Sequence, residues 1–308
     1  MPVSFIEVPE EFAGQRLDNF LLARLKNLPK SRLYRAVRKG EVRINKGRIK
    51  PDYRLVAGDS IRIPPFDLQP IEESPRAGTG LLQFMESRIL YEDAGLIAIN
   101  KPSGMPVHGG TGVSLGLIEC IRQLRPEAKF IELVHRLDKE TSGCLLIAKK
   151  RSVLLELHRL LVDKEHIHKR YIALVKGSWK GGTRKVSVPL LKNHLKSGER
   201  IVKVSEEGKA SSTIFNPLEH YQGATLIEAI PITGRTHQIR VHAAYIGHPL
   251  AGDSKYGDEA FNKSLKAQGL KRLFLHAAEL SFKLEGQPEL KLEAPLEQDL
   301  KDCLARLK

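Results

Sequence analysis

The segment from His135 to Gly143 holds the residues best suited to chemistry: a histidine, an arginine, acidic side chains and two hydroxyls, closed by a glycine. It lies between two apolar runs typical of β-strands, Leu133-Val134 before it and 144–148 after it. A carboxylate on a loop between buried strands is held rigidly and kept partly dry, which suits a nucleophile or a base. Asp138 is the candidate for that role. The alternative is a strand–turn–strand corner in which Asp138 and Thr141 bond the loop backbone.

A second polar stretch, Thr233 to His242, is expected to turn and then to open a helix that is capped by Thr236 and ends at Tyr245. This helix would bring Arg235 and Ile239, four residues apart, to one face. Because Arg235 precedes the helix start, it is poorly placed to stabilise the helix dipole, and a fixed carboxylate or phosphate is indicated as its target. The alternative is a surface helix with ordinary charges.

One aromatic residue, Tyr171, stands at the mouth of an apolar strand expected over 171–175 and directly follows Lys169 and Arg170. A tyrosine in that setting can stack on an exposed base while its hydroxyl reaches a polar partner. A core or sheet-edge tyrosine fits the sequence equally well.

Other classes of site lack their motifs. The histidines are not spaced as zinc ligands on a helix beside a glutamate, and His166-Ile167-His168 alternates as a strand does, without a nearby cysteine. Residues 104–116 are glycine-rich but lack the Lys-Ser/Thr ending of a phosphate loop. Neither Ser103 nor Ser142 stands in a nucleophile elbow. We therefore expect no metal site and no serine hydrolase.

The net charge of +14 points to a polyanionic partner, either nucleic acid or an acidic membrane surface. Most of it is concentrated between Arg24 and Arg54, where twelve Lys/Arg stand against two Asp/Glu, a net charge of +10. Apolar residues at helical spacing predict one helix over 17–28, ended by Pro29, and Ser31 is expected to cap a second helix over 32–39.

The second helix would end at Gly40 and turn a cationic face outward, before short strands at 42–44 and 60–63. Such a module can bind a phosphate backbone, and the alternative is a solvated helix face. The candidate contacts are Arg32, Arg35, Arg38, Lys39 and Arg43.

The remaining composition is that of an ordinary globular protein. The 308 residues allow two domains, with 41% hydrophobic and 28% charged residues. No apolar run approaches the ~18–20 residues of a membrane span, and the first twenty residues do not resemble a signal peptide. Three widely spaced cysteines suit a reduced, cytoplasmic protein. We expect no membrane association, and a monomer is the default expectation for the oligomeric state.

We expect a small module over 1–64, with its core at about 15–63, a linker rich in Pro, Glu, Ser and Gly over 65–88, and a larger domain over 89–308. The larger domain mixes strand-like and helix-like runs without strict alternation. This pattern predicts an α+β fold around a mixed, largely antiparallel sheet flanked by helices. Strands are expected at 96–100, 145–149, 171–175, 213–216, 224–230 and 290–293, and helices at 115–124, 152–163, 236–245 and 298–307.

Several of these segments resemble known families. Gln15–Phe20 and Arg38–Asn45 resemble the S4 RNA-binding domain, which favours structured RNA over a membrane as partner. His-Arg-Leu-Asp, two variable residues and Thr-Ser-Gly at 135–143 is similar to the signature of the RluA-type pseudouridine synthases, which isomerise uridine in RNA. Further matching segments, including two typical of bacterial enzymes that act on large-subunit rRNA, are 100–104, 169–174, 191–193, 197–200, 233–242 and 272–277.

The resemblance covers essentially the whole chain and implies an S4-like α/β RNA-binding domain followed by a pseudouridine synthase domain. It implies that Asp138 is an essential aspartate, Arg235 its charge partner and Tyr171 the ring that stacks on the uracil. It also implies a flipped target base, large-subunit rRNA as partner and, since the reaction is redox-neutral and needs no group donor, no cofactor. The further RNA contacts that it implies are His135, Arg136, Thr141, Ile239 and Leu275.

Whether Asp138 attacks the base, attacks the sugar or abstracts a sugar proton stays open at this point. Two other functions stay open as well. One is a non-catalytic RNA-binding or ribosome-assembly protein on the same fold. The other, a hydrolase with an aspartate nucleophile, leaves the basic module unexplained.

Overall fold

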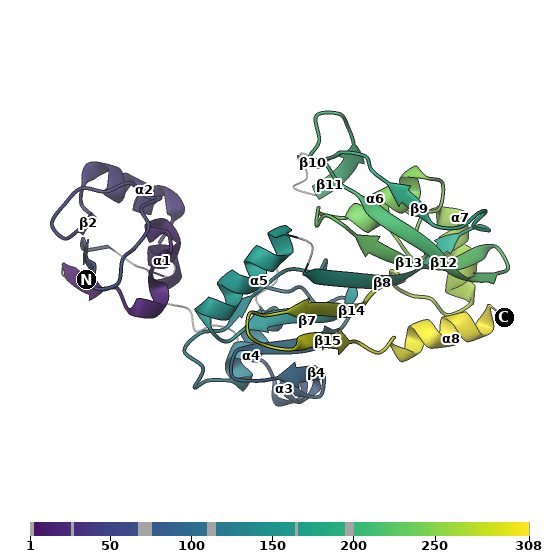
Figure 1. The fold of residues 1–308 in the computed structure, drawn as a ribbon, viewed down its shortest axis with the longest axis horizontal. Helices are drawn as coiled ribbons and strands as arrows, with labels where there is room; N and C mark the ends of the chain where they lie inside the picture. Colours follow the sequence, from purple (N-terminus) through teal and green to yellow (C-terminus); the bar gives the residue numbers. More distant parts are fainter. Residues whose placement is uncertain are drawn as a thin grey trace. The chain divides into compact units, whose positions relative to one another are not determined.

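The structure is a computed structural model that describes residues 3–25, 28–66, 76–109, 115–163, 166–194 and 200–307. The chain divides into two compact units, Met1–Arg76 and Ala77–Lys308, each with its own hydrophobic core (Figure 1). The matching segment 197–200 lies outside the described residues except at Arg200. None of the helices in the described ranges has the length and apolar content needed to cross a bilayer.

The first unit packs two helices against a small antiparallel sheet in the order β1-β3-β2. The predicted helices and the strand over 60–63 are confirmed, whereas β1 was not expected because its four residues carry little apolar pattern. Its elements are β1 (Ser4–Glu7), a short 3-10 helix (Glu10–Phe12), α1 (Leu17–Arg24), α2 (Lys30–Lys39), β2 (Arg43–Ile44) and β3 (Ser60–Ile63).

Helix α2 is amphipathic, as its sequence predicts. Leu33, Ala36 and Val37 are buried in the core, and the helix ends at Gly40 in the left-handed conformation (φ 71°). The predicted cap by Ser31 is wrong, because the helix already begins at Lys30 and has no side-chain cap.

The cations expected on the outer face of the first unit differ in exposure. Arg32 is half-buried and lies 3.7 Å from Glu41 in an ion pair. The exposed members of the group are Arg35, Arg38, Lys39 and Arg43.

Asp18 ties the two helices of this unit together. Its carboxylate is buried and accepts hydrogen bonds from the Arg16 guanidinium at 2.8 and 3.1 Å and from the Tyr34 hydroxyl at 2.7 Å. The Arg16 hydrogen bonds lower the pKa of Asp18 to about 2, from an ordinary value of 3.8. The ionised carboxylate therefore stabilises the folded unit.

We expect Asp18→Asn to lower the free energy of unfolding of this unit by about 1–3 kcal/mol at pH 7, because a charged, buried hydrogen-bond acceptor is lost. The folded pKa lies below the ordinary value, so this contribution is complete above about pH 4 and disappears as the pH falls through about 2. Hydrogen exchange of the α1 and α2 amides measures it. The exposed Asp52→Asn is the control, and equal protection in both variants would contradict the assignment.

The second unit is built on one large sheet in the order β4-β5-β7-β14-β8-β13-β12-β9, with β15 added beside β14 and β6 beside β7. Every pairing is antiparallel except the parallel pair β7–β14, so the predicted mixed, largely antiparallel sheet is confirmed. A separate hairpin joins β10 and β11. The strands are β4 (Ile89–Glu92), β5 (Leu96–Lys101), β6 (Glu132–Leu133), β7 (Ser142–Ala148), β8 (Ile167–Lys176), β9 (Arg184–Val186), β10 (Leu190–His194), β11 (Arg200–Val204), β12 (Thr213–Tyr221), β13 (Ala224–Pro231), β14 (Leu275–Lys283) and β15 (Glu289–Glu293).

Helices pack on both faces of this sheet (Figure 1). Since successive side chains of a strand point to opposite faces, β7 packs Leu145 and Ile147 against α3 and α4, and Leu146 against α5. On β8, likewise, Ala173 packs with α6, and Leu174 with α7 and α8. The helices are α3 (Thr79–Glu86), α4 (Leu117–Leu124), α5 (Arg151–Asp163), α6 (Gln238–Tyr245), α7 (Glu259–Ala267) and α8 (Gln298–Arg306).

The chain departs from the expected linker over 65–88 in its second half. Helix α3 begins at Thr79, and Met85 is completely buried against α4 in the core of the second unit. The sequence predicted a linker here because the Pro, Ser and Gly residues before this short helix hid its few apolar residues.

Candidate active site

The loop from His135 to Gly143 connects β6 to β7, which pair antiparallel with Leu133 opposite Ile147. The Thr141 amide donates to the Asp138 carbonyl at 3.1 Å, which closes the turn. Gly143 has φ +111° and lies against the backbone of Ala277 on β14, where a Cβ atom would collide. The glycine that ends the motif is therefore required by the close approach of the two parallel strands.

The end of β5 and the residues that follow it hold this loop through hydrogen bonds. Lys101 is completely buried, and its Nζ donates to the carbonyls of Pro102, Met105 and Lys139 at 2.8–3.0 Å. Ser103 Oγ donates to the Glu140 carbonyl at 2.7 Å. Burial lowers the pKa of Lys101 to about 7. These contacts fix the backbone that directly follows Asp138, and they give a structural role to a segment that the sequence identified only by resemblance.

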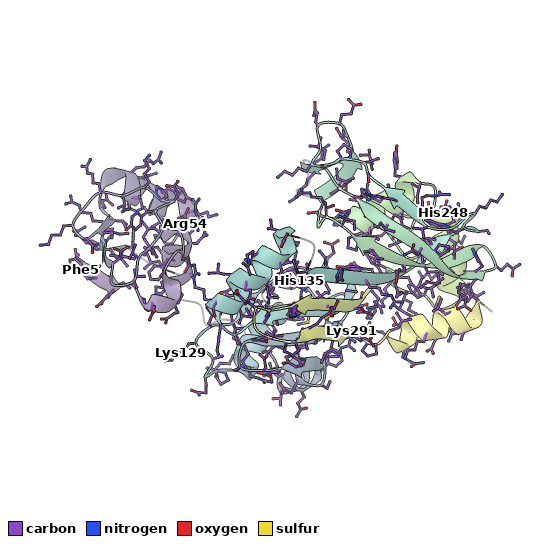
Figure 2. All side chains as sticks on the ribbon, viewed as in Figure 1. Phe5, Arg54, Lys129, His135, His248 and Lys291 are labelled. Carbon is purple, nitrogen blue, oxygen red and sulfur yellow. The ribbon has the colours of Figure 1, made fainter. Side chains whose placement is uncertain are left out.

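His135 also serves the loop itself. Its Nε2 accepts a hydrogen bond from the Leu146 amide at 3.1 Å, and burial lowers its pKa to about 4. The ring is therefore neutral near pH 7. Figure 2 labels His135 beside α5, where His158 bonds the neighbouring Val134 carbonyl.

A cavity of about 590 Å³ opens above this loop, entirely within the second unit. It brings together segments that are far apart in the sequence, namely the loop after β6, the start of β8, the stretch before α6 and the start of β14. All eight residues that the sequence proposed for this domain line it: His135, Arg136, Asp138, Thr141, Tyr171, Arg235, Ile239 and Leu275.

Asp138 lies in this cavity with its side chain 21% exposed. Its Oδ2 is 3.8 Å from His237 Nε2. Its negative charge acts together with burial to raise the pKa of Tyr171, whose ring lines the same cavity. The carboxylate is thus open to a ligand and surrounded by groups that can orient it.

The predicted pairing of Arg235 with Asp138 is not present. Arg235 is exposed, and its Nε donates to the Ala210 carbonyl at 3.3 Å. The predicted helix start is also wrong: α6 begins at Gln238 after a left-handed His237, and Thr236 does not cap it. Arg235 and Ile239 therefore do not share a helix face.

The side chain of Gln238 holds the turn of residues 233–237, directly before α6. Its Oε1 accepts from Thr233 Oγ1 at 2.6 Å and from the Arg235 amide at 3.1 Å. Its Nε2 donates to the Ser212 carbonyl and to Thr213 Oγ1, both at 2.9 Å. This buried amide fixes the loop before α6 against β12, and its backbone partners cannot be read from the sequence.

The buried arginine of the cavity is Arg240, which was not among the site residues expected from the sequence. Its guanidinium forms two hydrogen bonds of 2.7 Å with the carboxylate of Asp253, and the two side chains are only 5% and 0% exposed. The charge of Asp138 contributes to raising the pKa of Arg240. The sequence holds no local signal for this burial, because the residues directly before and after a helical position point in other directions.

Two of the expected RNA contacts form an apolar wall of the cavity. Ile239 and Leu275 are 7% and 4% exposed and belong to one apolar cluster with Tyr171 packed against it. Arg136, by contrast, is exposed at the cavity lining. Across the described ranges no three His, Cys, Asp or Glu side chains gather as metal ligands would.

Both the sequence and the fold of this chain are similar to those of known proteins. Residues 95–245 match the RNA pseudouridylate synthase family model and residues 15–61 match the S4 domain model. The chain is 54% identical to the ribosomal large subunit pseudouridine synthase C of Haemophilus ducreyi, over 99% of this chain and 96% of that protein. It is 53% identical to the protein of the same name in Escherichia coli K12, over 99% and 97% of the two chains.

Among solved structures, human RNA pseudouridylate synthase domain containing 4 matches with a TM-score of 0.61 and 28% identity, over 74% of this chain and 95% of that one. The full-length identity to curated relatives, the two family models and this fold agree with one another. The chain therefore belongs to the RNA pseudouridylate synthase family, with an S4 domain ahead of the synthase domain, and is an RNA pseudouridine synthase, an isomerase.

Proposed function

We propose that this enzyme converts specific uridines of large-subunit rRNA to pseudouridine and that Asp138 is its essential carboxylate. The substrate class comes from the names of relatives that are more than half identical over nearly their whole length. The observation that carries the assignment of the site is a single cavity holding Asp138, Tyr171 and Arg240.

The reaction breaks the bond between the sugar C1′ and the base N1, turns the uracil and joins C1′ to C5. The C5 proton is released and N1 takes up a proton, so the overall composition is unchanged. A uridine inside a folded RNA does not expose these atoms, so the target nucleotide is extruded at a cost on the order of a few kcal/mol. A cavity of about 590 Å³ is within the range that takes nucleotide-sized ligands.

Each lining residue has a role that fits its chemistry. The Tyr171 ring stacks on the uracil against the apolar wall of Ile239 and Leu275. Arg240, buried and charged, lines the same cavity and attracts the carboxylate of Asp138 electrostatically. Arg136, at the exposed part of the lining, contacts the RNA beside the extruded nucleotide. His135 and Thr141 shape the loop next to the RNA. No step in this scheme requires a cofactor.

The experiment that tests the substrate is tritium release from C5-labelled RNA by the purified enzyme. Full-length large-subunit rRNA is expected to release tritium in a stoichiometry of one or a few per molecule, while small-subunit rRNA releases none. Equal release from both RNAs, or release only from the small-subunit RNA, contradicts the proposed substrate.

The exposed cations of α2 and β2 are proposed to bind RNA phosphates, independently of the cavity chemistry. Deletion of residues 1–69 is expected to weaken rRNA binding and to flatten its salt dependence by about 0.7–0.9 in log Kd per log salt for each phosphate contact removed. A binding titration across salt concentrations measures this slope.

A more specific variant keeps the first unit and replaces only Arg35 and Arg38 with Gln. The matched control replaces the exposed Lys263 and Lys266 of α7 with Gln. The α2 variant is expected to flatten the slope and the α7 variant to leave it near the wild-type value. An unchanged salt dependence in the deletion variant contradicts the proposal that the first unit binds RNA phosphates.

A further inference from the structure

A line of three polar contacts leads from the β10–β11 hairpin to Asp138. The Val202 amide of β11 donates to the Tyr256 hydroxyl oxygen at 2.9 Å. That hydroxyl lies 2.7 Å from Nδ1 of His237, and Nε2 of the same ring lies 3.8 Å from Asp138 Oδ2. His237 stands immediately before α6 and lines the cavity.

The hydrogen bonds around the Tyr256 hydroxyl favour one tautomer of His237. The Tyr256 oxygen already accepts from Val202, and its own proton has Nδ1 of His237 as the acceptor in reach. Nδ1 is then an acceptor, so a neutral imidazole carries its proton on Nε2, the nitrogen that faces Asp138. Burial lowers the pKa of His237, and this effect outweighs the opposing effect of the Asp138 charge. The neutral form of the ring is therefore favoured.

The backbone of His237 is an independent sign of a positional requirement. Its φ of 54° and ψ of 18° lie in the left-handed region, which non-glycine residues rarely occupy. The next residue, Gln238, holds this conformation through its buried bonds to Ser212 and Thr213. Backbone strain that is held in place by its surroundings clusters at functional sites.

We propose that His237 is a positioning residue for the isomerisation, with its Nε2–H directed at Asp138 and its tautomer set by Tyr256. The inference rests on the proposed role of Asp138. The separation of 3.8 Å is longer than a hydrogen bond, as catalytic contacts often are before substrate binds and shortens them. Oriented in this way, the carboxylate meets the extruded uridine in one geometry rather than in several.

Two amide substitutions separate the two ring nitrogens. In His237→Gln the amide nitrogen reaches the place of Nε2 and can still donate to Asp138. In His237→Asn it reaches only the place of Nδ1, and asparagine tolerates the left-handed backbone. Tyr256→Phe removes the hydroxyl that sets the tautomer and leaves His237 in place. Tyr245→Phe, at an exposed position of α6 outside the cavity, is the control.

The assay is steady-state and single-turnover tritium release from C5-labelled large-subunit rRNA, with RNA affinity and thermal unfolding measured on every variant. His237→Asn is expected to lower kcat about 10–100-fold with KM unchanged within about twofold, because the carboxylate is misdirected. His237→Gln is expected to stay within about threefold of wild type, and Tyr256→Phe to lose about 3–10-fold in kcat. Tyr245→Phe retains the wild-type rate.

Equal kcat values for the Gln and Asn variants overturn the inference, whether both are active or both inactive, since a purely structural role does not distinguish the two amides. An unchanged kcat in Tyr256→Phe overturns the tautomer assignment. Asp138→Asn is measured in the same series. If that variant turns over, the proposed function fails; if it is inactive while His237→Asn is fully active, only the present inference fails.

Discussion

Asp138→Asn is expected to abolish pseudouridine formation while RNA affinity stays within about twofold of wild type. The amide has the shape of the carboxylate but no charge and no basicity, so every chemical role open to Asp138 is lost. Removal of an essential catalytic group lowers kcat by roughly 10⁴-fold or more. The fold is expected to be unaffected, because the side chain is partly open to solvent and the His237 ring lies 3.8 Å away, beyond hydrogen-bond distance.

Tritium release under single-turnover conditions measures this loss, and filter binding of the same RNA measures the affinity. Asp302→Asn, at an exposed position of α8, is the matched control and is expected to keep the wild-type rate. Turnover above about 1% of wild type in Asp138→Asn is incompatible with an essential carboxylate. A parallel loss of RNA affinity would instead place Asp138 in binding.

Asp253→Asn is expected to lower the free energy of unfolding of the second unit by about 3–5 kcal/mol, because it leaves the buried Arg240 charge without its counter-ion. Burial alone raises the pKa of Asp253, but the Arg240 hydrogen bonds and charge outweigh it, so the pKa lies below the ordinary 3.8. The carboxylate also accepts from the amides of Lys255 and Tyr256, so its loss loosens the segment that orients His237.

Trp179 makes this stability measurement specific to the second unit. It is the single tryptophan of the chain and is buried in the core of that unit, so its fluorescence follows the unfolding of that unit in denaturant. Glu132→Gln breaks the exposed Arg122–Glu132 pair, whose side chains are 44% and 52% exposed, and is expected to change stability by less than about 0.5 kcal/mol. Equal effects of the two substitutions would contradict a stabilising buried pair.

The sequence predicted the parts of the fold that follow from local pattern. Helix α2 and strand β7 were predictable because apolar residues recur at one period over several turns or along a continuous run. Strand β14 was not predicted, although its first residues lie in the segment 272–277 that was matched by resemblance. The strands β1, β9, β10 and β11 are short, and their partners supply most of their order. Helix α7 was missed because its one fully buried residue, Leu265, leaves almost no apolar stripe.

The sequence predicted which residues line the candidate site, but it did not predict which of them pair with one another. The motif residues identified the lining, yet Arg235 and Arg240 lie in the same stretch, and only the fold decides which is buried. That choice depends on Asp253, which reaches Arg240 through the turn after α6, and on Gln238, which fixes the preceding loop against β12. Neither contact follows from the helical or strand periodicity of the sequence. The left-handed His237 likewise had no sequence signal, since glycine or asparagine is the usual residue there.

The most direct test of the proposed function is a pseudouridine map of the rRNA from a strain without this protein, complemented with the wild-type protein or with Asp138→Asn at equal expression. We expect specific large-subunit uridines to lose the modification in the deletion strain, to regain it with wild type and to remain unmodified with Asp138→Asn. An unaltered large-subunit map in the deletion strain, or full restoration by Asp138→Asn, would contradict the account.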